Sequence, residues 1–90
     1  MIEGYLYVVD PQGRQLQDEF KGLLVNADTI LDWEPVPGKP KQTQTRIHWT
    51  MLNYPRLSVQ LNALGMVHGR PGMEGRRFDT SLSEAGCIIL

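Results

Sequence analysis

The chain has a single cysteine among its 90 residues, and this scarcity limits how the domain can be stabilised. Cys87 has no second cysteine with which to form an internal disulfide, and neither a cysteine pair nor a histidine cluster predicts structural zinc. A domain this small buries only about 60–65% of its unfolded surface, so its stability margin is narrow. We therefore expect homo-oligomerisation to contribute to its stability.

Long apolar runs are also missing, so the sequence predicts no membrane span. The segment before the first apolar run, residues 1–4, lacks the basic residues that begin a secretory signal peptide. Together with the lone thiol, these absences predict a cytoplasmic protein with no membrane partner. The length allows one domain, which we take to span residues 1–90.

Net charge is only −1, but its distribution along the chain is uneven. Residues 1–37 carry seven acidic and two basic side chains, whereas residues 38–90 carry seven basic and three acidic ones. The two halves could form an acidic and a basic face that pair across subunits or hold an anion. The alternative is that folding intermixes the halves and cancels the asymmetry.

Short, strand-length apolar runs separated by turn residues dominate the rest of the pattern. The predicted strands cover residues 5–9, 46–52, 56–64 and 87–90, with a further candidate at 76–82. Residues 10–13, Asp-Pro-Gln-Gly, predict a turn. Alternation within the runs places Trp49, Val59 and Leu61 on inward faces. The predicted fold is all-β, a small barrel or sandwich of five to seven short antiparallel strands.

Two segments resist a single assignment. Residues 15–32 combine a helical apolar stripe with poor helix formers, which leaves both one short helix near residues 15–25 and a pair of strands open. Residues 35–45 begin with three prolines and continue with polar residues, and this composition predicts a Pro-rich exposed loop.

The sequence offers no catalytic constellation, so we expect a protein that is not an enzyme. His48 alternates with apolar neighbours and is expected to face solvent, and His68 is expected to lie exposed in a loop. Neither has a nucleophile or a second ligand at short spacing, so no catalytic residue, metal site or cofactor is predicted.

Four arginines form the best candidate ligand site. Arg70, Arg76 and Arg77 flank a glycine-rich segment, and Arg56 comes one predicted strand earlier. Guanidinium groups suit phosphates, and glycine lets backbone amides approach an anion. The pI near 6.0 is low for a dedicated nucleic-acid binder, and exposed arginines are the default for this residue type.

Part of the chain resembles the PilZ domain family. The likeness rests on residues 55–61, Pro-Arg-Leu-Ser-Val-Gln-Leu, and residues 81–88, Ser-Leu-Ser-Glu-Ala-Gly-Cys-Ile, and covers about the last third of the chain. It implies a small β-barrel that binds cyclic di-GMP, with Arg56, Ser83 and Gly86 at matching positions. The family's acidic or amide residue is replaced by Ser81, and its paired arginines are incomplete.

The last four residues, Cys87–Leu90, have the Cys-aliphatic-aliphatic-Leu form of a prenylation signal. Because no polar spacer or basic segment precedes them, a C-terminal core strand is the better interpretation. Two functional hypotheses follow for the whole chain. The first is a non-catalytic protein-interaction or assembly module that binds another protein or itself, as small phage or accessory inhibitor proteins do. The second is an anion- or nucleotide-binding barrel, for a cyclic dinucleotide or single-stranded nucleic acid, that uses the four arginines.

Overall fold

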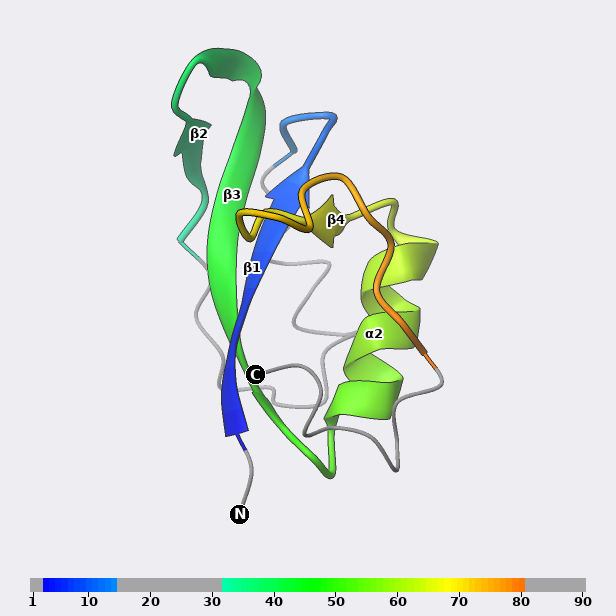
Figure 1. The fold of residues 1–90 in the computed structure, drawn as a ribbon. Coiled ribbons are helices and arrows are strands. Elements are labelled where there is room, and N and C mark those ends of the chain that lie inside the picture. The colour runs from blue at the N-terminus through cyan, green and yellow to red at the C-terminus, as the bar shows by residue number, and fades with distance from the viewer. Residues whose placement is uncertain (1–2, 15–31, 81–90) are drawn as a thin grey trace.

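The computed structural model describes residues 3–14 and 32–80 of the chain (Figure 1). The elements follow in the order β1 (Glu3–Asp10), β2 (Glu34–Val36), β3 (Lys39–Thr50), α2 (Tyr54–Ala63) and β4 (Val67–His68). The four strands form one antiparallel sheet in the order β2-β3-β1-β4. Figure 1 shows α2 lying to one side of this sheet.

In the long central strand pair β1–β3, side chains point alternately into the core and out to solvent. β1 pairs with β3 along its whole length, and Leu6 and Val8 are buried while Tyr5 is exposed. On β3, Ile47 and Trp49 are buried at the matching positions. The strands predicted from these two apolar runs are therefore confirmed, and so is the burial of Trp49.

Residues 56–64, predicted to be a strand, belong to helix α2 instead. Pro55 occupies the first helical turn, where its missing N–H has no intrahelical partner to lose. The buried residues of the helix follow the spacing i, i+3, i+4, i+7: Tyr54, Leu57, Ser58 and Leu61. Leu61 is buried as predicted, but the prediction for Val59 is wrong, because this side chain is 53% exposed on the outer face of the helix.

The core lies between α2 and the inner face of the sheet. Trp49 of β3 and Tyr54 of α2 meet edge to face, with ring centroids 5.6 Å apart and an interplanar angle of 70°. Phe78, from the loop after β4, closes the core at one side. The buried apolar cluster consists of Leu6, Val8, Ile47, Trp49, Tyr54, Leu57, Leu61, Met66 and Phe78.

Residues 35–45, predicted to be an exposed loop, form most of a β-hairpin made by β2 and the first half of β3. Gly38, with φ +78°, provides the positive φ that a type II turn requires at its third position. Pro35 is tolerated because β2 is an edge strand of the described sheet. The polar residues 41–45 form a strand because Thr43 and Thr45, which are β-branched, fill buried positions of β3.

The fold class is confirmed in its coarser part. The described residues are mostly strand with one short helix, arranged as a four-stranded antiparallel sheet, and a barrel or sandwich of five to seven strands is not confirmed. The turn predicted at residues 10–13 is present, whereas residues 76–80 form loop instead of the first part of a strand. The predictions for residues 15–31 and 81–90 lie outside the described residues.

The sheet interleaves the acidic and basic halves of the sequence. β1 and β2 come from residues 1–37, β3 and β4 come from residues 38–90, and the two kinds alternate across the sheet. Strand pairing therefore mixes the halves, as the second of the two charge hypotheses expected.

Candidate functional site

The loop after β4 contains three of the four arginines predicted to bind a ligand. We call residues 69–77 the Gly/Arg loop. Gly72 and Gly75 have φ +91° and +79° and stand third in two successive turns, the position at which a type II turn needs a positive φ. The backbone of the loop is thus fixed by its turns. The bonds that close them run from Met73 N–H to Arg70 C=O (2.9 Å) and from Arg76 N–H to Met73 C=O (3.1 Å).

Two further anchors attach this loop to the fold. His68 donates its backbone N–H to Arg76 C=O and accepts from Gly75 N–H, both at 2.9 Å. The side chain of Asn62 on α2 donates to Phe78 C=O at 2.8 Å and accepts from Phe78 N–H at 2.9 Å. The loop is therefore held at β4 and again at the helix.

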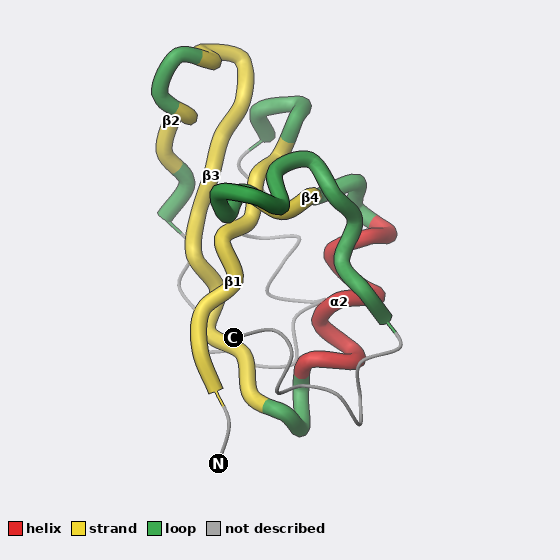
Figure 2. The backbone as a smooth tube through the Cα atoms, in the orientation of Figure 1, coloured by secondary structure: helices red, strands yellow, loops and turns green. Residues whose placement is uncertain are grey.

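Three of the predicted arginines lie on the Gly/Arg loop, and the fourth lies on α2. Arg70, Arg76 and Arg77 are exposed on the Gly/Arg loop, which continues beside the C-terminal part of α2 (Figure 2). Arg56 is exposed in the first turn of the helix, six residues before Asn62. Six residues span about 9 Å along a helix axis, so Arg56 lies away from the point at which the loop is anchored.

His68 is buried, and the expectation that it lies exposed in a loop is wrong. The residue belongs to strand β4, and its buried ring packs at a tilt against the Phe78 ring, with the ring centroids 4.2 Å apart. Burial lowers the pKa of His68 below its usual value, and the charges of Arg70 and Arg76 lower it further. Both guanidinium groups therefore act on the same imidazole ring.

A second candidate surface lies on the outward side of the β1–β3 pair. We call Glu3, Tyr5, Tyr7, Arg46 and His48 the open sheet face. Tyr5 and Tyr7 are 58% and 45% exposed. The Arg46 guanidinium carbon lies 5.4 Å from the centre of the Tyr5 ring, and the His48 ring meets Tyr5 at 5.6 Å. Because His48 Nε2 is 2.7 Å from Glu3 Oε1, the aromatic, basic and acidic groups form one connected surface.

Sequence reasoning found only one member of the open sheet face. It placed His48 on the solvent side of its strand, which the structure confirms. It did not single out Tyr5 and Tyr7, although their alternation with Leu6 and Val8 was the signal that places two aromatic rings on one outward face.

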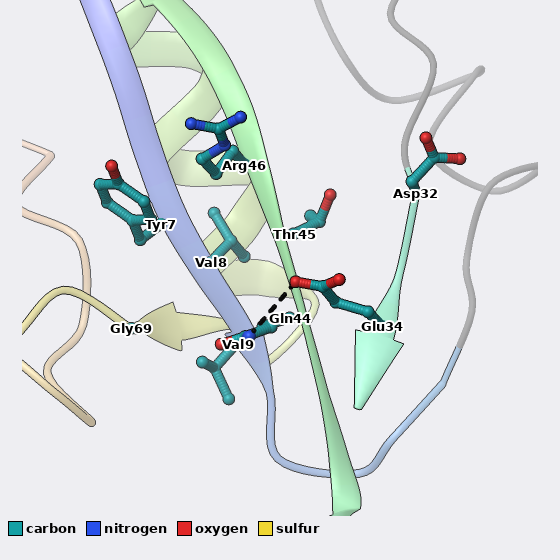
Figure 3. A pocket seen from close by; sticks show the side chains of 9 residues that line it. All are labelled: Tyr7, Val8, Val9, Asp32, Glu34, Gln44, Thr45, Arg46 and Gly69. Atoms are coloured by element: carbon teal, nitrogen blue, oxygen red, sulfur yellow. Dashed lines mark hydrogen bonds between the residues drawn. The ribbon is translucent and has the colours of Figure 1, made fainter. Parts of the chain in front are cut away.

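A hollow of about 540 Å³ adjoins the open sheet face (Figure 3). The Gln44 amide Nε2 donates to Glu34 Oε1 across the strand pair at 3.4 Å. The wall carries charges of both signs together with aromatic and amide groups, so it suits a polar, hydrogen-bonding partner. Its lining includes Tyr7, Asp32, Glu34, Gln44, Arg46 and Gly69.

Asp10 is fully buried, and its partners give it a structural role. Its carboxylate accepts hydrogen bonds from Gln12 N–H at 2.8 Å, from Arg14 N–H at 2.9 Å and from Arg14 Nε at 3.0 Å. Arg14 also donates from Nη2 to Leu64 C=O at the end of α2. This cluster ties the end of β1 to the end of the helix.

Tyr54 is a further buried titratable group. Burial raises its pKa from 10.0 to about 12, and the carboxylate of Asp79 adds to the shift. The hydroxyl therefore stays protonated at neutral pH and does not supply a phenolate for chemistry.

Within residues 3–14 and 32–80, no three histidine, cysteine, aspartate or glutamate side chains gather as metal ligands would. In the same part of the chain, no helix combines the length and apolar character needed to cross a membrane. Cys87 and the residues Ser81, Ser83 and Gly86 of the PilZ resemblance lie outside the described residues.

Comparison of the chain with protein-family models, curated proteins and solved structures finds no match. The resemblance to the PilZ family stays a prediction, and its segment 55–61 lies within helix α2. The function must therefore be argued from the two surfaces described above.

Proposed function

We propose that this protein is a non-catalytic binding module that contacts another protein, or a second copy of itself, through the open sheet face. The observation that carries the proposal is the exposure of Tyr5 and Tyr7, 58% and 45%, on a face that also presents Arg46. Tyrosine and arginine are enriched at the centres of protein interfaces, where a few residues supply most of the binding energy.

The contacts within the open sheet face also favour binding. Tyr5 contacts both the Arg46 guanidinium and the ring of His48, and His48 is held by Glu3. These neighbours restrict the side chains before a partner arrives, which lowers the entropy that binding must overcome. The rigid strand pair beneath them fixes their spacing.

The first test compares the wild type with the double variant Tyr5→Ala, Tyr7→Ala by sedimentation over a range of concentrations. Self-association that weakens at least about tenfold in the variant supports a second copy as partner. Leu52→Ala is the matched control, because Leu52 is 83% exposed at the turn before α2 and lies off the open sheet face. Equal weakening by the control contradicts the proposal.

The second test covers partners other than the protein itself. A displayed library of random peptides is selected against the wild type, and each enriched peptide is retested against the double variant and the Leu52→Ala control. Peptides that bind the wild type and the control but not the double variant support the proposal. A wild type that neither self-associates nor selects such peptides refutes it.

A further inference from the structure

The Gly/Arg loop holds two adjacent arginines between its two backbone anchors. Arg76 C=O is bonded to His68 N–H, and the residue that follows Arg77, Phe78, is bonded through both its N–H and its C=O to the side chain of Asn62. The backbone of the pair is thus fixed on both sides, while both side chains are exposed. A pair of cations is presented from a backbone that does not need to be ordered on binding.

The charges around the pair leave it available for an anion. Arg76 and Arg77 make no ion pair with any residue in the described part of the chain. Arg76 and Arg77 are adjacent in the sequence, and both are exposed. The acidic residues in this stretch are Glu74, which is exposed, and Asp79, which acts on the Tyr54 hydroxyl.

The glycines of the loop leave room for a ligand beside the backbone. A Cβ added at Gly72 or Gly75 would meet no atom within 4 Å. The N–H groups of Met73, Gly75 and Arg76 are already bonded within the fold, so the guanidinium groups are the donors for a phosphate. A planar guanidinium can donate two parallel hydrogen bonds to it.

We propose that Arg76 and Arg77 bind the phosphate group of a small phosphorylated ligand. The proposal is independent of the one for the open sheet face, because it uses other residues on another element. A fork of two donors per guanidinium predicts that phosphate geometry matters as well as charge.

The experiment is calorimetric titration of the whole protein with pyrophosphate at about 20 mM salt, and again at about 200 mM, where screening is stronger. We expect the wild type to bind and the double variant Arg76→Ala, Arg77→Ala to bind at least about tenfold more weakly. Arg56→Ala is the control, because it removes another exposed arginine, from the N-terminal end of α2. We expect this control to bind as the wild type does.

A second variant, Arg76→Lys with Arg77→Lys, keeps the charge and removes the planar forks, and we expect binding to weaken several-fold. A wild type that does not bind pyrophosphate overturns the proposal, and so does an equal loss in Arg56→Ala, which would reveal a general charge effect. Circular dichroism of each variant confirms that the fold is intact before binding is compared.

Two further ligands distinguish the source of the phosphate. A nucleoside triphosphate that binds while the nucleoside alone does not supports recognition of the phosphate of a nucleotide. Equal binding of the nucleoside overturns the proposal. Binding of a single-stranded oligonucleotide without binding of pyrophosphate also overturns it, because the loop would then need a polyanion and not a single phosphorylated ligand.

Discussion

The side-chain amide of Asn62 pairs with the backbone of Phe78 through both of its polar atoms, at 2.8 and 2.9 Å. In this way a helix side chain satisfies a donor and an acceptor of a loop residue as a neighbouring strand would. The pair also places the Phe78 ring in the core, where it contacts His68. One side chain therefore connects α2, the Gly/Arg loop and β4.

Replacing Asn62 by Ala is expected to destabilise the protein by about 1–3 kcal/mol, because two backbone groups of a buried residue lose their partner. Urea unfolding measures this change as a shift in midpoint. Val59→Ala is the control, since Val59 lies on the exposed face of the same helix. An Asn62→Ala midpoint equal to that of Val59→Ala would show that the two hydrogen bonds contribute no net stability.

The two faces of α2 predict opposite outcomes for one kind of substitution. Val59→Asp is expected to cost no more than about 1 kcal/mol, because the new charge is solvated on the outer face. Leu61→Asp places an unpaired charge at a fully buried position and is expected to abolish folding of a domain whose whole stability is about 5 kcal/mol or little more. Thermal melts of both variants decide the matter. A Val59→Asp variant that fails to fold would restore the strand assignment.

Apolar spacing alone could not separate helix from strand over these residues, for a physical reason. Leu57 and Leu61 are four apart, a spacing that satisfies both a period of two and a helical period of 3.6. Val59 and Ala63 completed the strand pattern although both are exposed. The decisive signal was Pro55, which is favourable in the first turn of a helix and unfavourable within a strand.

The buried carboxylate of Asp10 gives a third prediction. Asp10→Asn is expected to lower the free energy of unfolding by about 2–4 kcal/mol, because the four donors from Gln12 and Arg14 lose a charged acceptor. Asp32→Asn, at an exposed position, should leave stability nearly unchanged. Denaturant midpoints of the two variants test this, and equal midpoints would contradict a structural role for Asp10.

His68 predicts how stability depends on pH. Its folded pKa lies below the usual 6.5, so the unfolded state binds more protons once the pH falls below about 6.5. The contribution of neutral His68 is complete above that value and is lost as the pH decreases further. Burial of the ring, which packs against Phe78, and the charges of Arg70 and Arg76 lower the pKa of His68.

The measurement compares the free energy of unfolding at about pH 7.5 and about pH 5.5 for the wild type and His68→Asn. The wild type should lose more stability than the variant between these two values. A variant with the same or a greater loss would show that other groups control the acid side of the profile.

The candidate sites were predictable to different degrees. The glycines of residues 69–75 marked the segment that carries Arg70, Arg76 and Arg77, because the backbone preference of glycine is local. The two successive turns of this segment were not predicted. Arg56 was grouped with Arg76 on the expectation that residues 56–64 form a strand, whereas Arg56 lies in the first turn of α2.

Alternation with Leu6 and Val8 places Tyr5 and Tyr7 on one side of β1. The basic members of the open sheet face could not be grouped with them in this way, because only the pairing of β1 with β3 brings Arg46 and His48 beside the two tyrosines.

The hydrogen bond from Arg14 to Leu64 and the contact of Trp49 with Tyr54 both join residues that lie before the turn at Leu52 to residues that lie after it. Among the described residues, the core is shared between the part before the exposed turn at Leu52 and the part after it. A cut at this turn would yield two pieces whose apolar surfaces complete each other. Such pieces are suited to fragment complementation, in which reassembly of the two halves reports that they have met.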